Sequence, residues 1–264
     1  MEQIIVIEGT DGCGKATQTQ RLQESLKKEN YSVFTTSFPN YASPSSGPVK
    51  LYLQGELGEE ADSLSAKQSS ILYATDRLCT YKKEMEAYFK DDHSVILLDR
   101  YVSSNLLHQG GKILKDTQDY SKLDAFTNWI ETLEYEDLQL PRPTLTFFLH
   151  LSTETSLQLM ENRANKITQD SKKDILESDV THLKYAEKSG IYLAKKLGWT
   201  IIECETEGGL RSIEDIHQEI DRIVKEHLSK IQNEKQKSQE STHRNRIICI
   251  TALIAFICCF PSYL

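Results

Sequence analysis

The sequence predicts an α/β fold in which helices flank a five-stranded parallel sheet. Short apolar runs alternate along the chain with longer segments of helical period, as they do in sheets joined by crossover helices. The short runs are apolar on consecutive positions, which indicates strands buried on both faces. A chain of 264 residues can bury a full core and favours one domain over two.

The expected strands are short and rich in β-branched or aromatic residues, which favour an extended backbone. In chain order they are residues 4–7, 32–37, 94–98, 144–151 and 199–204. Segments with a helical apolar period separate and follow them, and we expect helices at residues 16–29, 65–90, 102–109, 120–136, 154–162, 175–197 and 213–230. Together these elements form one expected domain, residues 1–229.

Composition excludes some classes of function. The formal net charge of −8 argues against broad binding to nucleic acid, which needs many basic side chains. A small anionic substrate stays compatible with it, because a local basic pocket is enough. The six cysteines show no C-x-x-C spacing, and they fit a reducing, intracellular compartment. The N-terminus has no features of a secretory signal.

The C-terminal part differs in composition from the rest. Residues 230–246 are almost free of apolar side chains, which predicts a flexible linker. Residues 247–260 carry no charge and follow a basic flank, a pattern typical of a membrane tail anchor at residues 247–264. As a helix, this apolar run reaches roughly 21 Å against a hydrocarbon core of about 30 Å. An apolar helix outside the fold, packed on the domain or on a partner, is the alternative.

The strongest motif follows the first strand and precedes the first helix. It reads GTDGCGK and fits G-x-x-x-x-G-K, whose glycines let backbone N–H groups converge on phosphate oxygens. Lys15 would supply a charge to the β- and γ-phosphates. The candidates for binding a nucleoside triphosphate are Gly9, Thr10, Asp11, Gly12, Cys13, Gly14, Lys15, Ala16 and Thr17. A glycine-rich turn with an incidental lysine is the alternative.

Two residues of this loop need a separate explanation. Ala16 stands where most such loops place a hydroxyl that ligates magnesium, and Thr17 points roughly 100° away on a helix. Either water fills that position, or Asp99 holds the ion through water, or catalysis is lost. Asp11 would be repelled by the triphosphate, so it faces a sugar hydroxyl or caps the turn.

Charged residues follow the third predicted strand directly. Asp99 and Arg100 lie at the carboxyl end of a buried strand, where open α/β sheets bind their ligands. Asp99 would orient magnesium-bound water, and Arg100 could hold two phosphate oxygens. A salt bridge at the strand end is the alternative.

Several motifs follow one another in a specific order. Asp11 stands in the phosphate loop, and Phe38-Pro39 ends the second strand. Tyr73 and Arg77 form an aromatic-x-x-x-Arg pattern, and Asp99-Arg100-Tyr101 precedes a serine and then Gln109-Gly110. With this set, the chain resembles the thymidylate kinase family over nearly all of residues 2–229. The resemblance implies the fold of a P-loop nucleoside-monophosphate kinase.

The resemblance also implies a set of residues that bind dTMP: Asp11, Phe38, Tyr73, Arg77, Arg100, Ser104, Asn105 and Gln109. Tyr73 would stack on thymine and Arg77 would donate to a base carbonyl, since residues four apart share one helix face. Asn105 could read the edge of the ring through its amide. The alternative for Tyr73 is one more core aromatic side chain.

The polar and basic residues 163–173 resemble the lid of the bacterial-type members, in which a glycine at position 12 leaves the phosphate loop without a basic residue. Arg163, with Lys166, would then approach ATP and act on the transferring phosphoryl group. A solvated basic loop is the alternative. The chain departs from the family pattern at Tyr41, where several members use an arginine on the 5′-phosphate, and Lys50 is a candidate substitute.

The sequence therefore predicts an enzyme that forms dTDP from ATP and dTMP for dTTP synthesis. Lys15, Arg100 and Arg163 are the expected catalytic residues, and magnesium is the expected cofactor. The resemblance implies a homodimer, and the catalytic domain is expected in the cytoplasm. The alternatives are a kinase for another nucleoside monophosphate or a deoxynucleoside, and a non-catalytic, membrane-tethered nucleotide-binding protein.

Overall fold

The structure is a computed structural model that describes residues 3–90, 93–160, 174–234 and 237. It divides into two compact units, residues 1–217 and 218–264. The predicted lid cations Arg163 and Lys166 lie outside the described residues, as does the predicted apolar segment 247–264. Of the predicted linker, only residues 230–234 and 237 are described, and residues 230–234 are helical.

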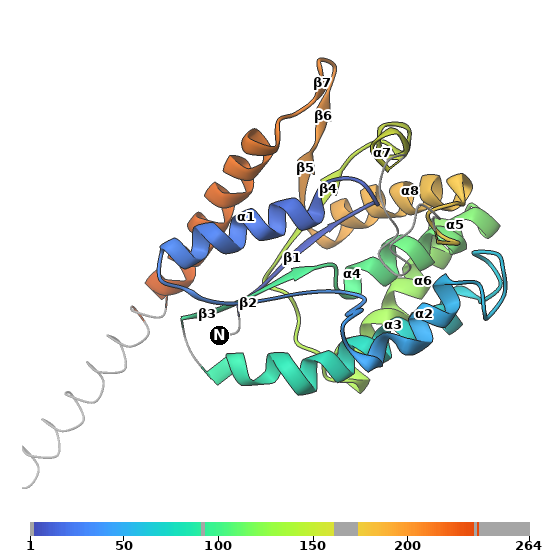
Figure 1. The fold of residues 1–264 in the computed structure, drawn as a ribbon, viewed down its shortest axis with the longest axis horizontal. Coiled ribbons are helices and arrows are strands. Elements are labelled where there is room, and N and C mark those ends of the chain that lie inside the picture. The colour runs from blue at the N-terminus through green and yellow to red at the C-terminus, as the bar shows by residue number, and fades with distance from the viewer. Residues whose placement is uncertain (1–2, 91–92, 161–173, 235–236, 238–264) are drawn as a thin grey trace, which may run out of the picture. The chain divides into compact units, whose positions relative to one another are not determined.

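The first unit contains the predicted five-stranded sheet, and all its strands are parallel. The strands are β1 (Ile4–Gly9), β2 (Ser32–Ser37), β3 (Ser94–Asp99), β4 (Leu145–His150) and β5 (Thr200–Glu203). Their order is β2-β3-β1-β4-β5 (Figure 1). The predicted fold class is therefore confirmed. Because β1 and β3 are neighbours, the residues that follow both strands emerge at one edge of the sheet.

Helices cover both faces of the sheet, with α1 on one side and α3 and α6 on the other (Figure 1). Successive side chains of a strand point to opposite faces, and every residue of β1 and β3 is buried. Ile4 and Val6 pack in one core cluster with Leu123 and Phe126 of α6. Burial on both faces explains why these strands read as continuous apolar runs.

The helices of this unit are α1 (Lys15–Lys28), α2 (Gly47–Leu53), α3 (Ala66–Thr80), α4 (Val102–Ser104), α5 (Gly110–Thr117), α6 (Tyr120–Glu131), α7 (Thr153–Met160) and α8 (Val180–Leu197). Three π-helical segments prolong α3, α4 and α6: η2 (Tyr81–Met85), η4 (Asn105–Gln109) and η5 (Thr132–Asp137). Two short 3₁₀ segments are η1 (Pro44–Ser46) and η3 (Glu86–Lys90). Such π segments often mark functional sites.

Some predicted element boundaries were wrong. The helix expected at residues 102–109 continues through Gly110 and Gly111 as α5. The helix expected at residues 175–197 begins at Val180, because the side chain of Asp179 caps it by accepting a hydrogen bond from the backbone N–H of His182 at 2.9 Å. Helix α2 and the antiparallel hairpin of β6 (Glu205–Thr206) and β7 (Gly209–Leu210) were not predicted.

The second unit is helical over its described residues 218–234. Among the helices that the structure describes, none is both long enough and apolar enough to cross a bilayer.

Helices α5 and α8 approach each other closely at Gly111. A Cβ atom placed there would lie 2.8 Å from the backbone nitrogen and 3.0 Å from the Cα of Ala186. Neither atom belongs to a flexible side chain, so the backbones would have to separate. At Gly47, which begins α2 with a φ of −50°, an added Cβ would meet nothing within 4 Å.

We expect Gly111→Ala to lower the free energy of unfolding by about 1–3 kcal/mol, because overpacking forces a backbone shift. Urea denaturation measures this change. Gly47→Ala is the matched control and should change the stability by less than about 1 kcal/mol. Equal stability of the two variants would contradict the close contact at Gly111.

Candidate active site

The loop between β1 and α1 adopts backbone conformations that favour glycine. Gly9, Gly12 and Gly14 have φ values of 153°, 81° and 89°. Gly14 is the N-cap, so α1 begins at Lys15, and the free N–H groups of its first turn are available to an anion. The predicted order of strand, loop and helix is present, and the turn has the backbone features of a phosphate-binding loop.

A pocket lies against this loop, and we call it the loop pocket. Its lining residues are Asp11, Gly12, Gly14, Lys15, Ala16, Thr17, Asp99 and Leu159. The Lys15 side chain is buried, and its Nζ donates to the carbonyl oxygen of Thr10 at 2.7 Å. The lysine charge is thus held inside the loop, at the wall of the pocket.

Asp99 offers a place for a hydrated cation in the loop pocket. Its side chain is buried, and within the described residues its Oδ1 has no hydrogen-bond partner. A buried carboxylate oxygen without a partner is costly unless a ligand or water satisfies it. The described part of the chain holds no cluster of three or more His, Cys, Asp or Glu side chains suited to a metal. Magnesium keeps several waters and takes few protein ligands, so a single carboxylate such as Asp99 suits it.

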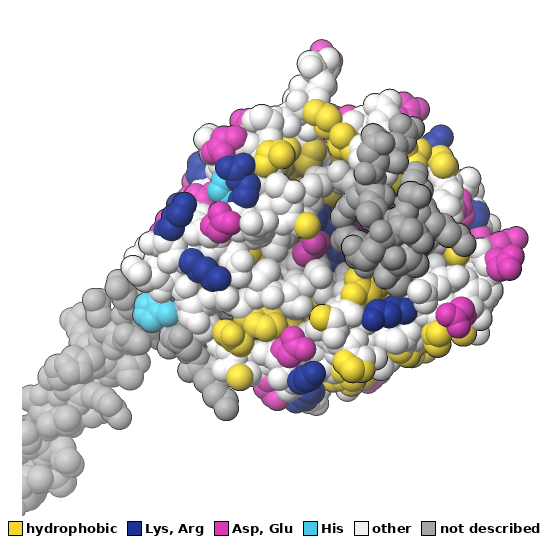
Figure 2. Space-filling view, viewed as in Figure 1, with side chains coloured by type: hydrophobic (Ala, Val, Ile, Leu, Met, Phe, Trp, Pro, Cys, Tyr) yellow, Lys and Arg dark blue, Asp and Glu magenta, His cyan; other side chains and the backbone are white. Residues whose placement is uncertain are grey.

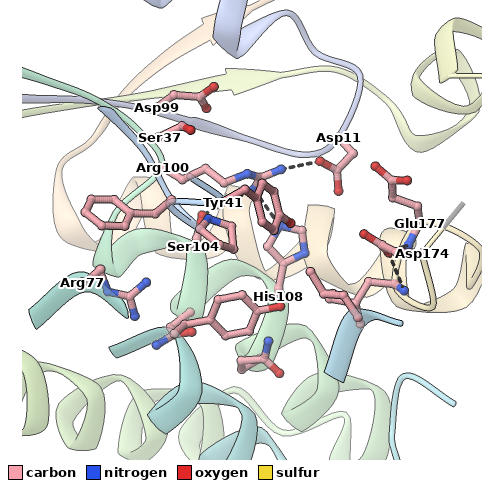
Figure 3. A pocket seen from close by; sticks show the side chains of 17 residues that line it. Asp11, Ser37, Tyr41, Arg77, Asp99, Arg100, Ser104, His108, Asp174 and Glu177 are labelled. Atoms are coloured by element: carbon pink, nitrogen blue, oxygen red, sulfur yellow. Dashed lines mark hydrogen bonds and ion pairs between the residues drawn. The ribbon is translucent and has the colours of Figure 1, made fainter. Parts of the chain in front are cut away.

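A second pocket lies at the carboxyl ends of β2 and β3, and we call it the strand-end pocket (Figure 3). Its empty volume is about 850 Å³, including the open mouth. All eight residues that the resemblance places around dTMP line it, and they are Asp11, Phe38, Tyr73, Arg77, Arg100, Ser104, Asn105 and Gln109. It shares Asp11 and Asp99 with the loop pocket, so the two pockets adjoin at these carboxylates.

The space-filling view shows where described side chains of each kind gather on one face of the molecule (Figure 2). Basic and acidic side chains alternate over this face and form no continuous basic surface (Figure 2). This scatter of both signs on one face agrees with the net charge of −8.

Arg100 lines the strand-end pocket and has a left-handed backbone conformation, at a φ of 71°. Its Nη2 pairs with Oδ1 of Asp11, and its Nη1 lies 3.5 Å from Oε1 of Glu8 (Figure 3). Burial lowers the pKa of Arg100, but the carboxylates of Asp11, Glu8 and Asp99 together raise it above its usual value. The guanidinium therefore stays charged and is fixed in place.

Asp11 thus contacts two cations, because Nζ of Lys15 also lies 4.0 Å from its Oδ1. The sequence left open a sugar hydroxyl or a turn cap as the partner of this carboxylate. In the structure, Asp11 joins the phosphate loop to Arg100.

Glu8 is a site residue that the sequence analysis missed. Its side chain is fully buried, and it accepts hydrogen bonds from Ser103 Oγ at 2.7 Å and Ser104 Oγ at 2.8 Å. Its Oε1 accepts from the backbone N–H of Gly9 at 3.0 Å. A carboxylate in an otherwise apolar strand was the available signal, since an unpaired buried charge is rarely tolerated.

Aromatic side chains form one wall of the strand-end pocket. Phe38, which precedes Pro39 through a cis peptide bond, and the half-buried Tyr73 and Tyr41 all line it. Tyr73 and Tyr41 also pack against the core cluster around Tyr52. Tyr73 therefore lines the pocket and also packs on the core, and its stacking on thymine stays a prediction.

Arg77 forms a buried ion pair that the sequence did not reveal. Its Nε and Nη2 each lie 2.6 Å from an oxygen of Glu134, and both side chains are at most 1% exposed. Asn105 Nδ2 donates to the same carboxylate at 2.8 Å. Two residues of the strand-end pocket are therefore held by one carboxylate of η5.

His108 was also missed as a site residue. Its Nε2 lies 2.9 Å from Arg100 Nη1, and its Nδ1 lies 3.4 Å from Nε2 of His182. Burial, and then the charge of Arg100, lower the pKa of His108 well below its usual value. The neutral ring accepts a hydrogen bond from Arg100, which adds to the contacts of the guanidinium with Asp11 and Glu8.

Tyr41 stands where several family members use an arginine, and Lys50 was the candidate substitute for that arginine. Tyr41 lines the strand-end pocket, whereas Lys50 Nζ donates to the carbonyl oxygen of Tyr41 at 2.8 Å and is not part of the lining. Asp174 and Glu177 line the same pocket and were not predicted. No sequence motif marked these two carboxylates. They follow a basic run in which only the cations were predicted to act on the substrate.

Asp174 has an unusual charge state for an aspartate. Burial and then the charge of Glu177 raise its pKa to about 7, although the backbone N–H groups of Glu177 and Leu176 act in the opposite direction. An unfolded aspartate has a pKa near 4. The folded chain therefore holds a proton between about pH 4 and pH 7 that the unfolded chain releases, so stability falls as the pH rises through this range.

We expect Asp174→Asn to remove this dependence. Between pH 4 and pH 8 the wild-type chain should lose on the order of 2 to 4 kcal/mol of stability relative to the variant. Urea denaturation at a series of pH values measures the difference. A constant difference across the range would contradict the raised pKa.

Comparison with known proteins agrees with the site. A sequence model of the family described as thymidylate kinase matches residues 7–220. A thymidylate kinase of Mycobacterium tuberculosis is 30% identical over 167 residues, which cover 62% of this chain and 72% of that protein. A thymidylate kinase of Halothermothrix orenii is 28% identical over 223 residues, covering 84% of this chain and 95% of that protein. A probable thymidylate kinase of Pyrococcus horikoshii is 29% identical over 224 residues, covering 85% and 96%. Because the family match extends over most of the sequence, this chain belongs to the thymidylate kinase family.

Proposed function

We propose that this chain transfers the γ-phosphoryl group of ATP to dTMP and releases ADP and dTDP, a step of dTTP synthesis. Membership of the thymidylate kinase family supports the reaction. The observation that carries the assignment is the meeting of the loop pocket and the strand-end pocket at Asp11 and Asp99. Two phosphorylated nucleotides bound in them would bring donor and acceptor phosphates together.

Lys15 and Arg100 are the proposed catalytic residues among those described. In-line phosphoryl transfer asks little covalent chemistry of a protein, so positioning and charge stabilisation supply most of the catalysis. Lys15 would hold the phosphates of ATP from the loop side. Arg100 would hold the acceptor phosphate, and its fixed contacts with Asp11 and His108 reduce the reorganisation needed during transfer.

The remaining parts of the ATP site are proposals of the same kind. Arg163 and Lys166 would contribute positive charge at the transferring group. Magnesium would neutralise charge on the β- and γ-phosphates when it is bound. Asp99 would hold its water, because Ala16 has no hydroxyl and Thr17 is expected to point roughly 100° away on the helix. Turnover that persists in excess EDTA would contradict the requirement for a metal.

The strand-end pocket would bind dTMP through its base and its sugar. Tyr73 and Phe38 offer aromatic surface to the thymine ring. Arg77 would donate to a base carbonyl, while Asn105 and Gln109 border the base. Asp11 would accept a hydrogen bond from a sugar hydroxyl in addition to its ion pair with Arg100.

We also propose a homodimer in the cytoplasm, as family members commonly pair through helices near the substrate pocket. Residues 247–264 are proposed as a membrane attachment. Analytical ultracentrifugation decides the first point, and sedimentation of the full chain with lipid vesicles decides the second.

A coupled assay with ATP and magnesium tests the substrate assignment directly. The full chain should turn over dTMP faster than dUMP, UMP, CMP or thymidine supplied at the same concentration. The strand-end pocket should distinguish them because it carries both phosphate-binding and base-binding groups. A higher kcat/KM for any of the others would replace dTMP as the assigned acceptor.

Arg100→Ala should lower turnover of dTMP by about a hundredfold or more, because it removes a charge that acts on the transferring group. The affinity for ATP, measured by calorimetry, should change by less than about threefold if Arg100 acts on the acceptor side. Arg142→Ala is the control, since Arg142 is exposed and pairs with Glu131 on the surface. Equal losses of turnover and of ATP affinity would refute the assigned role.

A further inference from the structure

Glu134 is a buried carboxylate outside the set of residues assigned to the substrate. It lies in η5, is fully buried and does not line the strand-end pocket. Its oxygens nevertheless hold two residues that do, Arg77 at 2.6 Å and Asn105 at 2.8 Å. Buried ion pairs are weak evidence of stability, because burying both charges costs about as much as their attraction returns. Stability alone therefore does not account for Glu134, and its contacts with Arg77 and Asn105 point to a second role.

The partners of Asn105 fix the orientation of its amide. Nδ2 donates to the carbonyl oxygen of Ser70 at 3.2 Å and to Oε1 of Glu134 at 2.8 Å. A backbone carbonyl and a carboxylate can only accept, so the amide must direct its nitrogen to them. Both N–H groups are then used. The group that Asn105 has left for a ligand is its carbonyl oxygen, which is an acceptor.

Arg77 has the opposite polarity, because a guanidinium only donates. Nε and Nη2 donate to Glu134, and Nη1 donates to the carbonyl oxygen of Tyr101 at 3.3 Å. Of its five N–H groups, one on each terminal nitrogen remains for a ligand in the strand-end pocket. The pocket thus carries an acceptor from Asn105 and donors from Arg77, all held by one carboxylate.

We propose that Glu134 is a positioning residue that sets this polarity and thereby selects a keto pyrimidine over cytosine. Thymine and uracil carry an N3–H donor beside the O4 acceptor, which matches an acceptor from Asn105 and a donor from Arg77. Cytosine carries an N3 acceptor beside an amino group, so both contacts would be mismatched. Leaving buried polar groups unpaired is what makes such discrimination strong. The inference rests on the proposed function, because it assumes that the base binds at these residues.

Glu134→Gln tests the proposal, because glutamine replaces one acceptor oxygen by a donor amide. Its oxygen should stay with Arg77, the charged donor, and its nitrogen should then face Asn105. The carbonyl oxygen of Ser70 would still accept from Asn105, while the new amide nitrogen would donate to Asn105. The Asn105 amide would then no longer be fixed in one orientation, and it could present an N–H group to the pocket. That polarity suits N3 of cytosine and opposes N3–H of thymine.

The assay compares kcat/KM for dTMP, dUMP and dCMP in the wild-type chain and in Glu134→Gln. The ratio of dTMP to dCMP should fall by about tenfold or more, mainly through KM for dTMP, since the base is remote from the reacting phosphate. The ratio of dTMP to dUMP should stay within about twofold, because both bases present the same edge. A general loosening of the pocket would change the ratio of dTMP to dCMP and the ratio of dTMP to dUMP alike.

Two further variants keep the test decisive. Ile130→Ala removes a buried apolar side chain one helical turn before Glu134, and both ratios should persist despite the lost stability. If Glu134→Gln does not fold, Asn105→Ala takes its place, and loss of the acceptor should lower the ratio of dTMP to dCMP by about tenfold. Arg77→Ala is less suitable, because it would leave the Glu134 charge buried without its partner.

The outcomes separate the two proposals. A wild-type chain that neither binds nor phosphorylates dTMP would overturn the proposed function, and this inference with it. A wild-type chain that prefers dTMP, with a Glu134→Gln or Asn105→Ala variant that keeps the wild-type ratio of dTMP to dCMP, would overturn the inference alone.

Discussion

Arg100 and Asp11 form an ion pair between the ends of two neighbouring strands. Asp11 belongs to the loop after β1, and Arg100 follows β3 directly, with its backbone N–H bonded to the carbonyl oxygen of Ile7 at 3.0 Å. The parallel register of β1 and β3, in which Ile7 lies beside Asp99, brings these residues to the same edge of the sheet. The ion pair then fixes the phosphate loop relative to the strand-end pocket.

The charges around this boundary do not balance on their own. Among the described residues that line either pocket, the cations are Lys15, Arg77 and Arg100, and Arg77 is already paired with Glu134. The carboxylates are Asp11, Asp99, Asp174 and Glu177. A site for two anionic nucleotides needs more positive charge than this. The proposed magnesium ion and the proposed roles of Arg163 and Lys166 would answer that need, and the raised pKa of Asp174 removes part of the negative charge.

The strands of the sheet were predictable from the local sequence. β1 and β3 are buried on both faces, so each reads as a continuous apolar run that is typical of a buried strand. Prediction from the local sequence failed where a long-range contact overrides local preference. Gly110 and Gly111 read as the end of a helix, yet α5 begins with them. They are glycines because helices pack closely there, and a Cβ at Gly111 would meet the backbone of Ala186 in α8. In the site, the motif residues were predictable from a family pattern. Glu134 was not, because it lies 57 positions from Arg77 and no local pattern links the two.

The π-helical segment η4 supplies Asn105, His108 and Gln109 to the strand-end pocket. A turn closed by a bond between residues five apart holds one residue more than an α-helical turn, and each residue of a helix advances by about 100°. A homologue with an ordinary α-helix at this point would therefore present its neighbouring side chain to the ligand. A sequence alignment of such a protein with this one needs a one-residue gap within positions 105–109. Without the gap, the alignment would pair residues whose side chains face different directions.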